Sequence, residues 1–184
     1  MERVCLFRLG ADAETLTRIF TGKGTQKVAG HGLCRLNAEQ LQKKLDLLVH
    51  MGLLEAAEGF LREGEKRATY TIHPAIRDGF LNALAPEDKL NSHEALREGL
   101  EVSLEVSLGG APGENPSDPD TLDLLEEIVH HTLQSGHVRE AYDIHRNRIG
   151  GYKNLGWRLG AYERGERICR AFAGGQSPES VVSL

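Results

Sequence analysis

A lysine flanked by glycines is the first pattern in the sequence that suggests chemistry, because glycine loops with a lysine wrap phosphate groups. Lys23 lies between Gly22 and Gly24 in the stretch Thr21–Thr25. A nucleotide-binding phosphate loop also needs a second glycine upstream, at a fixed spacing, and a hydroxyl directly after the lysine. Thr17 and Gly24 occupy those two positions here. The stretch is therefore predicted to be an ordinary loop.

A glutamate and a histidine three positions apart, Glu127 and His130, are the second candidate. This spacing offers two metal ligands from one helix face, but di-iron bundles need a second such pair and two further carboxylates. The sequence has no second pair and no Gly-x-Ser-x-Gly nucleophile motif. We therefore expect interfacial or solvated histidines here, and neither a metal site nor catalytic residues. The chain is not predicted to be an enzyme.

His73 is the third candidate, because it leaves a predicted strand beside Pro74 and the start of the next helix. The unpaired N–H groups of a helix start attract anions, and an imidazole adds a hydrogen-bond donor. The position therefore suits a phosphate-bearing ligand. A half-exposed histidine at a strand end, without any ligand, is the simpler interpretation of the same pattern.

The helix that precedes this region is predicted over residues 38–50. Apolar residues recur there at the spacing of one helix face. Asn37 is a suitable N-cap, and Gln40 completes a capping box with it. Gly52 ends the helix, since only glycine enters the left-handed cap conformation without steric cost.

Two extended segments follow the helix and lead to His73. They are predicted at 53–57 and 68–73, on either side of a charged, glycine-containing turn at 63–67. Pro74 cannot donate to a strand ladder but fits the first turn of a helix. A helix, a two-stranded ribbon and a further helix in this order are typical of a winged helix.

The N-terminal residues complete that unit. Residues 1–20 are predicted to form two short helices that meet at Gly10, with Asp12 as the N-cap of the second. Residues 21–32 are glycine-rich and poor in apolar side chains, so a loop is expected there. The predicted winged-helix domain spans residues 1–86.

The rest of the chain is predicted to form a connecting helix followed by helical hairpins. The prediction is a connecting helix at 87–108, a flexible linker at 109–119, helical hairpins at 120–174 and a polar tail at 175–184. Gly136 and Ala141 have the spacing of the turn in a tetratricopeptide (TPR) repeat, and Leu159–Gly165 is a second, irregular copy. The predicted fold class is mainly α with a small β-wing, a winged helix followed by TPR-like antiparallel helical hairpins.

Charge and composition restrict the kind of protein. The 184 residues are 40% hydrophobic and 27% charged, with no apolar run long enough to cross a bilayer. The three cysteines are scattered and read as buried thiols, so a cytoplasmic location is expected. Residues 1–86 carry 12 Lys/Arg against 10 Asp/Glu, and residues 87–184 carry 10 against 17. Neither half concentrates the basic charge that a nucleic-acid binder needs.

The region around His73 resembles a known family. The segments 51–57 (MGLLEAA) and 68–80 (ATYTIHPAIRDGF) look like the winged-helix domain of STAND-class signalling ATPases, the NB-ARC and apoptotic-ATPase group. Residues 6–8 (LFR) look like the start of that domain, and residues 125–160 are similar to the helical-repeat sensor that follows it. The family's ATPase core has no counterpart here. The chain is therefore expected to be a fragment, or a separately encoded remnant, of such a protein.

The resemblance implies a role for one residue. In this family the histidine that leaves the wing contacts the β-phosphate of bound ADP and helps to lock the inactive state. Only His73 matches that position. Pro74 stands where plant and animal members have an acidic residue. The contact is expected only when an ATPase core is present. This chain is expected to hold no cofactor by itself, and ADP or ATP is expected to bind to the full-length protein.

Two functions are predicted on this basis. The first is a non-catalytic regulatory and protein-interaction module of a STAND-type ATPase, whose winged helix packs against a nucleotide-binding core outside the chain. Its repeats would bind a protein partner, with no membrane contact and no nucleic acid. The alternative is a winged-helix DNA-binding transcription regulator with a helical dimerisation tail. A third possibility is a plain interaction scaffold, in which the winged helix is only a packing unit.

Overall fold

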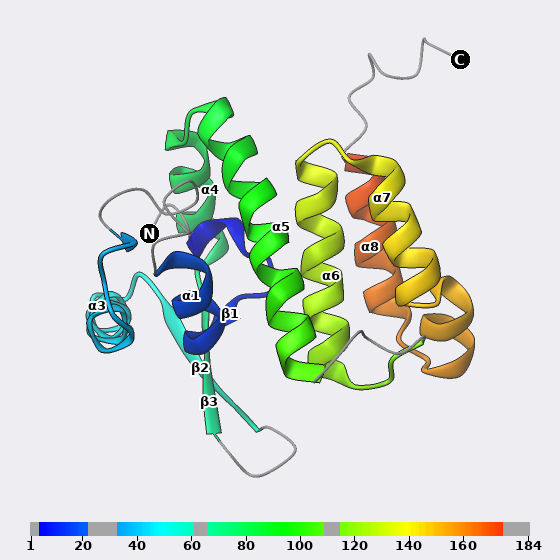
Figure 1. Cartoon of the computed structure of the whole chain (residues 1–184), viewed down its shortest axis with the longest axis horizontal. Coiled ribbons are helices and arrows are strands. Elements are labelled where there is room, and N and C mark those ends of the chain that lie inside the picture. The colour runs from blue at the N-terminus through cyan, green and yellow to red at the C-terminus, as the bar shows by residue number, and fades with distance from the viewer. Residues whose placement is uncertain (1–3, 22–32, 61–65, 109–114, 175–184) are drawn as a thin grey trace. The chain divides into compact units, whose positions relative to one another are not determined.

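The computed structural model of the protein describes residues 4–21, 33–60, 66–108 and 115–174. The chain divides into two compact units, 1–99 and 100–184, and the division lies inside one long helix. The described residues are mainly helical with one small antiparallel sheet, which confirms the general fold class predicted from the sequence (Figure 1).

The described residues of the first unit form a 3-10 turn, three short strands and three complete helices. They are η1 Val4–Leu6, β1 Ala11–Asp12, α1 Ala13–Phe20, α3 Ala38–His50, β2 Glu55–Phe60, β3 Lys66–Thr71 and α4 Pro74–Ala83. The long helix α5 Pro86–Leu108 continues from the first unit into the second. The elements of the second unit are then α6 Pro119–Gln134, α7 Val138–Asp143, η2 Ile144–Arg148, η3 Lys153–Arg158 and α8 Tyr162–Gly174.

The sheet of the first unit has three strands in the order β1-β3-β2, all antiparallel. Tyr70 in the central strand pairs with Ala11 on one side and Ala56 on the other. The two-stranded ribbon predicted from the sequence is therefore incomplete, and β1 lies where a turn between two helices was expected. A strand of two residues has no alternating pattern to detect. Gly10, with φ +89°, lets the chain approach β3, because a Cβ there would lie 2.7 Å from the Tyr70 carbonyl oxygen.

The helix boundaries around the hairpin follow the predicted local signals. Asn37 and Gln40 form the capping box at the start of α3, and Gly52 takes a φ of +69° directly after the helix cap. Strand β2 begins at Glu55, two residues later than predicted, and β3 ends at Thr71. Part of the predicted turn at 63–67 and nearly all of the loop at 21–32 lie outside the described residues.

The N-terminal segment differs from the prediction of two short helices. The first is only the 3-10 turn η1, and the second is α1, capped as expected by Asp12. The Asp12 carboxylate accepts hydrogen bonds from the backbone N–H groups of Glu14 and Thr15 at 2.8 and 2.9 Å. Residues 4–9 are too few to close a second full helix before Gly10.

The core of the first unit gathers apolar side chains from η1, α1, α3 and β3. Its most buried members include Leu6, Phe7, Leu16, Ile19, Phe20, Leu41, Leu45 and Tyr70. The Gln42 amide donates a hydrogen bond of 2.7 Å to the Tyr70 hydroxyl, which joins α3 to the sheet. Arg77 of α4 donates to the Cys5 carbonyl oxygen at 2.8 Å. Both bonds give a buried or half-buried polar group a partner.

The predicted connecting helix is present as α5. Gly99 lets α5 come close to α1, because a Cβ at that position would lie 2.7 Å from the Ile19 side chain. Of the linker predicted at 109–119, residues 109–114 lie outside the description and α6 already starts at Pro119, capped by Asp118. The predicted tail at 175–184 also lies outside it.

The second unit is built on α6. Gly136, with φ +84°, ends α6, and α7 then folds back against it (Figure 1). Ala141 is fully buried where α7 meets α6. The hairpins predicted at 120–174 were expected to consist of ordinary helices, but α7 changes into the π-helical stretch η2 after Asp143. Wide turns of this kind have no sequence period of their own, so the pattern predicts an ordinary helix.

The cysteine environments are more varied than predicted. All three are free thiols, but only Cys5 is buried, while Cys34 is half-buried and Cys169 is exposed. The expectation of three buried thiols is therefore wrong for Cys169, which lies on an outer position of α8. Among the described residues, no helix combines the length and the apolar character required to cross a membrane.

Candidate functional site

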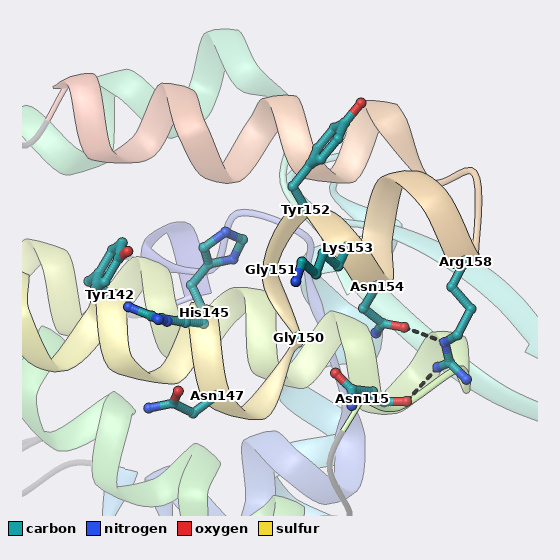
Figure 2. Close-up of a pocket in the computed structure, with 11 residues that line it drawn as sticks. Asn115, Tyr142, His145, Asn147, Gly150, Gly151, Tyr152, Lys153, Asn154 and Arg158 are labelled. Carbon is teal, nitrogen blue, oxygen red and sulfur yellow. Dashed lines mark hydrogen bonds between the residues drawn. The ribbon is translucent and has the colours of Figure 1, made fainter.

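The second unit carries an open hollow of about 960 Å³ on one side (Figure 2). Eleven residues line it, and all of them belong to the segments at 115 and 142–158. The volume lies at the upper end of the range for small-molecule and peptide pockets. The described lining residues are mostly polar, and none of them carries a carboxylate.

Two glycines open the hollow between two π-helical stretches. Gly150 and Gly151 have φ values of +85° and +55°, so the chain turns sharply between η2 and η3. A Cβ at Gly150 would lie 1.9 Å from the Asn115 amide oxygen and 2.7 Å from the Asn154 Cβ. The first atom ends a mobile side chain, but the second is fixed to the backbone. π-helical turns occur often at functional sites.

A hydrogen-bond network holds one wall of the hollow in place. The buried Asn154 amide donates to the carbonyl oxygens of Ile149 and Pro116 at 2.6 and 3.0 Å. Its oxygen accepts a bond of 2.5 Å from Arg158 Nε. Arg158 also donates to the carbonyl oxygens of Asn115 and Pro116, as Figure 2 shows for Asn115. This network ties η3 to residues that lie about forty positions earlier in the chain.

Replacing Gly150 with alanine is expected to destabilise the protein more than replacing Gly160. Both glycines have positive φ, so each change costs about 1–2 kcal/mol of backbone strain. Only at Gly150 does the new methyl group meet Asn154, which adds about 1–3 kcal/mol of overpacking. Urea unfolding of the two variants measures the difference. Equal losses of stability in both variants would contradict the packing around the hollow.

The charge in this region is unlike that of the rest of the unit. From Ile144 to Tyr162 the sequence contains four Lys/Arg residues and no Asp/Glu, the cations being Arg146, Arg148, Lys153 and Arg158. Arg148 is neutralised by Glu101 at 2.6 Å, and Arg158 is bound to backbone carbonyl oxygens. Arg146 and Lys153 line the hollow and form no ion pair with any described residue. These two cations are therefore available to an anion.

His145 lies inside the hollow but adds no charge at neutral pH. Burial lowers the pKa of the His145 imidazole, because the charged form loses its hydration. Its Nδ1 is buried without a hydrogen-bond partner among the described residues, and the ring packs beside Phe172 with centroids 6.2 Å apart. The neutral ring offers one donor and one acceptor.

Aromatic side chains stand at and near the rim. Tyr142 and Tyr152 line the hollow and are 50% and 60% exposed (Figure 2). Trp157 is 74% exposed and lies edge-on to Tyr152, with ring centroids 6.2 Å apart. Exposed tyrosine, tryptophan and arginine are the residue types that dominate binding energy at protein interfaces.

The predicted site residue His73 lies far along the chain from this hollow, in the first unit. It is exposed rather than half-exposed, and it is the N-cap of α4. A plain strand-end histidine would be unpaired, but the His73 Nδ1 accepts a hydrogen bond of 3.3 Å from the Ala75 N–H. The first backbone N–H groups of a helix have no partner within the helix, and the His73 ring accepts a hydrogen bond from one of them. The neutral ring then carries its proton on Nε2, which the bond leaves available as a donor.

Of the two alternatives expected for the histidines near Glu127, interfacial or solvated, the burial of His130 and His131 fits the interfacial one. Glu127 faces His131, one turn further along α6, with Oε2 and Nε2 3.5 Å apart. His131 is buried and His130 is half-buried. Glu127 is therefore close to His131, four positions along the helix, and not to His130, which the three-residue spacing predicted as its partner. The glycine loop at 21–25 lies almost entirely outside the described residues.

Sequence reasoning missed the hollow as a site. The absence of carboxylates from Ile144 to Tyr162, together with the pair Gly150-Gly151 and three aromatic residues, was the available signal. In comparisons with known proteins, no family model, curated protein or solved structure matches the chain.

Proposed function

We propose that the chain is a non-catalytic regulatory and protein-interaction module of a cytoplasmic STAND-type signalling ATPase. Its first unit is a winged helix that packs against a nucleotide-binding core outside these residues. Its second unit is a set of TPR-like hairpins that binds a protein partner. ADP or ATP belongs to that core, where His73 contacts the nucleotide phosphate.

The surface of α3 is the observation that carries this proposal. Leu47 lies in the last turn of α3 and Met51 is the C-cap of that helix, and they are 56% and 59% exposed. Large apolar side chains on an exposed helix face favour a protein contact, since each gains free energy when it leaves water. In a winged helix that reads DNA, the same helix would offer cations to the phosphates.

The charges on α3 also weigh against the DNA-binding alternative. Lys43 is paired with Glu39 at 2.7 Å, and Lys44 lies two positions before Asp46. Each cation that could meet a phosphate therefore has a carboxylate nearby. The helix has no cation excess of the kind that supplies non-specific DNA affinity.

The connectivity of the first unit supports the winged-helix part. The sheet order β1-β3-β2, with α1 and α3 between β1 and β2, is the arrangement expected of that fold. His73 follows β3 and begins α4, with a free Nε2 available to donate to a phosphate oxygen. Both features accord with the resemblance noted for this region.

The test begins with the reading frame upstream of Met1, where the proposal expects a segment with a complete phosphate loop. That segment, produced as a separate chain, is titrated into this protein by calorimetry. Replacing Leu47 and Met51 together with glutamine is expected to weaken the association at least tenfold, because the apolar contact is lost. Val102→Gln is the matched control, since Val102 is 50% exposed but lies in the second unit.

Two results would contradict the proposal. One is an association that the α3 variant leaves unchanged. The other is sub-micromolar binding of this chain to a 20-base-pair DNA duplex with a steep salt dependence, abolished by Lys43→Glu and Lys44→Glu, which would favour the transcription regulator.

A further inference from the structure

We propose that the hollow of the second unit binds a short acidic peptide segment of the protein partner. This inference rests on the proposed function, because it assigns the partner-binding role to particular residues. It names the chemistry of the segment: carboxylates for the cations, a peptide backbone for the amides, and apolar side chains for the aromatic rim.

The unpaired cations are the first support. Arg146 and Lys153 both line the hollow, one from η2 and one from η3. The other two cations of the region already have partners within the protein, Arg148 with Glu101 and Arg158 with backbone carbonyl oxygens. A carboxylate in the hollow would therefore meet two cations and no opposing carboxylate among the lining residues. Charge-assisted hydrogen bonds of this kind are the strong ones.

The amides and the aromatic rim are the second support. The side chains of Asn115 and Asn147 line the hollow and make no side-chain hydrogen bond to a described residue. An amide carries both a donor and an acceptor, as a peptide bond does, so each can pair with an extended backbone. Tyr142 and Tyr152 at the rim offer apolar faces to the side chains between the carboxylates.

A nucleic acid fits the same surface less well. Unit 100–184 contains eight Lys/Arg and thirteen Asp/Glu residues, a net charge of −5. A polyanion extends beyond the hollow and meets this negative field, and two unpaired cations neutralise few phosphates. A short acidic segment places its charge only where the cations are.

The experiment selects from a display library of random twelve-residue peptides against the whole chain. Peptides enriched by the parent are expected to carry an excess of Asp and Glu. Fluorescence anisotropy with the best labelled peptide then compares the parent with Arg146→Glu/Lys153→Glu, which should bind at least tenfold more weakly. The control is Arg139→Glu/Arg170→Glu, which changes the net charge equally at exposed positions outside the hollow and should bind as the parent does.

Other outcomes overturn the inference. These are selected peptides without an acidic excess, or equal binding by the parent and the hollow variant. Tighter binding of a twelve-nucleotide oligo(U) or of ADP than of any selected peptide, lost in the hollow variant, assigns the hollow to a nucleic acid or a nucleotide instead. Because the test of the proposed function changes only α3, a failure there and a failure here are seen in different variants.

Discussion

Replacing Glu126 with alanine is expected to be the most destabilising single change at a polar position of the second unit. Glu126 is fully buried in α6 and receives Arg167 through both carboxylate oxygens, from Nε at 2.9 Å and Nη2 at 3.1 Å. Arg164 donates to the same carboxylate at 3.0 Å. This cluster joins α8 to α6, and the hydrogen bond with Glu126 is the main reason why the pKa of Arg167 is raised.

The free energy of unfolding is expected to fall by about 2–4 kcal/mol, slightly less than when a fully enclosed ion pair is broken. The reduction follows because the Arg167 side chain is 39% exposed and can regain water when its partner is removed. Arg164 keeps a second partner in Asp123 at 2.6 Å. A melting temperature lower by roughly 5–15 °C, followed by circular dichroism, would agree with this loss for a chain of this length.

Glu166→Ala is the matched control on the adjoining helix. It removes an ion pair of similar length, because Arg170 lies 2.7 Å from Glu166, but both side chains are mostly exposed. Exposed pairs of this kind contribute about 0–1 kcal/mol. Similar melting temperatures for Glu126→Ala and Glu166→Ala would contradict the role of the buried cluster. Glu126→Gln keeps the shape and should lie between them.

Replacing His73 with alanine is expected to weaken ADP retention in a protein that contains both this chain and an ATPase core. The free energy of ADP binding is expected to weaken by about 1.5–3 kcal/mol, which is the scale of a hydrogen bond to a charged group. That range corresponds to roughly a tenfold to a 150-fold faster release of ADP. The population should shift towards the active assembly, because the ADP-bound form is the one that the contact stabilises.

The capping role of His73 and its proposed contact with ADP can be separated by the choice of substitution. His73→Asn keeps both an N-cap and a hydrogen-bond donor, whereas His73→Asp keeps the cap but places a negative charge towards the phosphate. ADP release should therefore be fast in the Asp and Ala variants and close to the parent in the Asn variant. Only His73→Ala should lose cap stability, by about 0.5–1 kcal/mol. Release rates that follow cap strength instead of donor chemistry would leave His73 as a capping residue alone.

Local sequence determined several features of this protein. The capping box of Asn37 and Gln40, the glycine after α3 and the proline that opens α4 are each found where the sequence predicts them. Interactions within about four residues create these features, so the information is present in a short window. The general fold class follows in the same way, from helical and alternating patterns.

The third strand and the site depended on the tertiary structure. Strand β1 exists only because Ala11 pairs with Tyr70, and a two-residue strand has no pattern of its own. The change from α7 to π-helical turns has no periodic signal either. The sequence pattern shows neither feature, so it predicts a two-stranded ribbon and ordinary helices instead.

The free cations of the hollow could not be predicted from the sequence either. The sequence gives four equivalent cations from Arg146 to Arg158, and nothing local distinguishes them. The partner of Arg148 lies 47 residues away along the chain, and the Asn115 carbonyl that holds Arg158 lies 43 residues away. Which cations are neutralised, and which remain open to a ligand, is therefore decided by long-range packing, because charges distant in sequence pair only after the chain has folded.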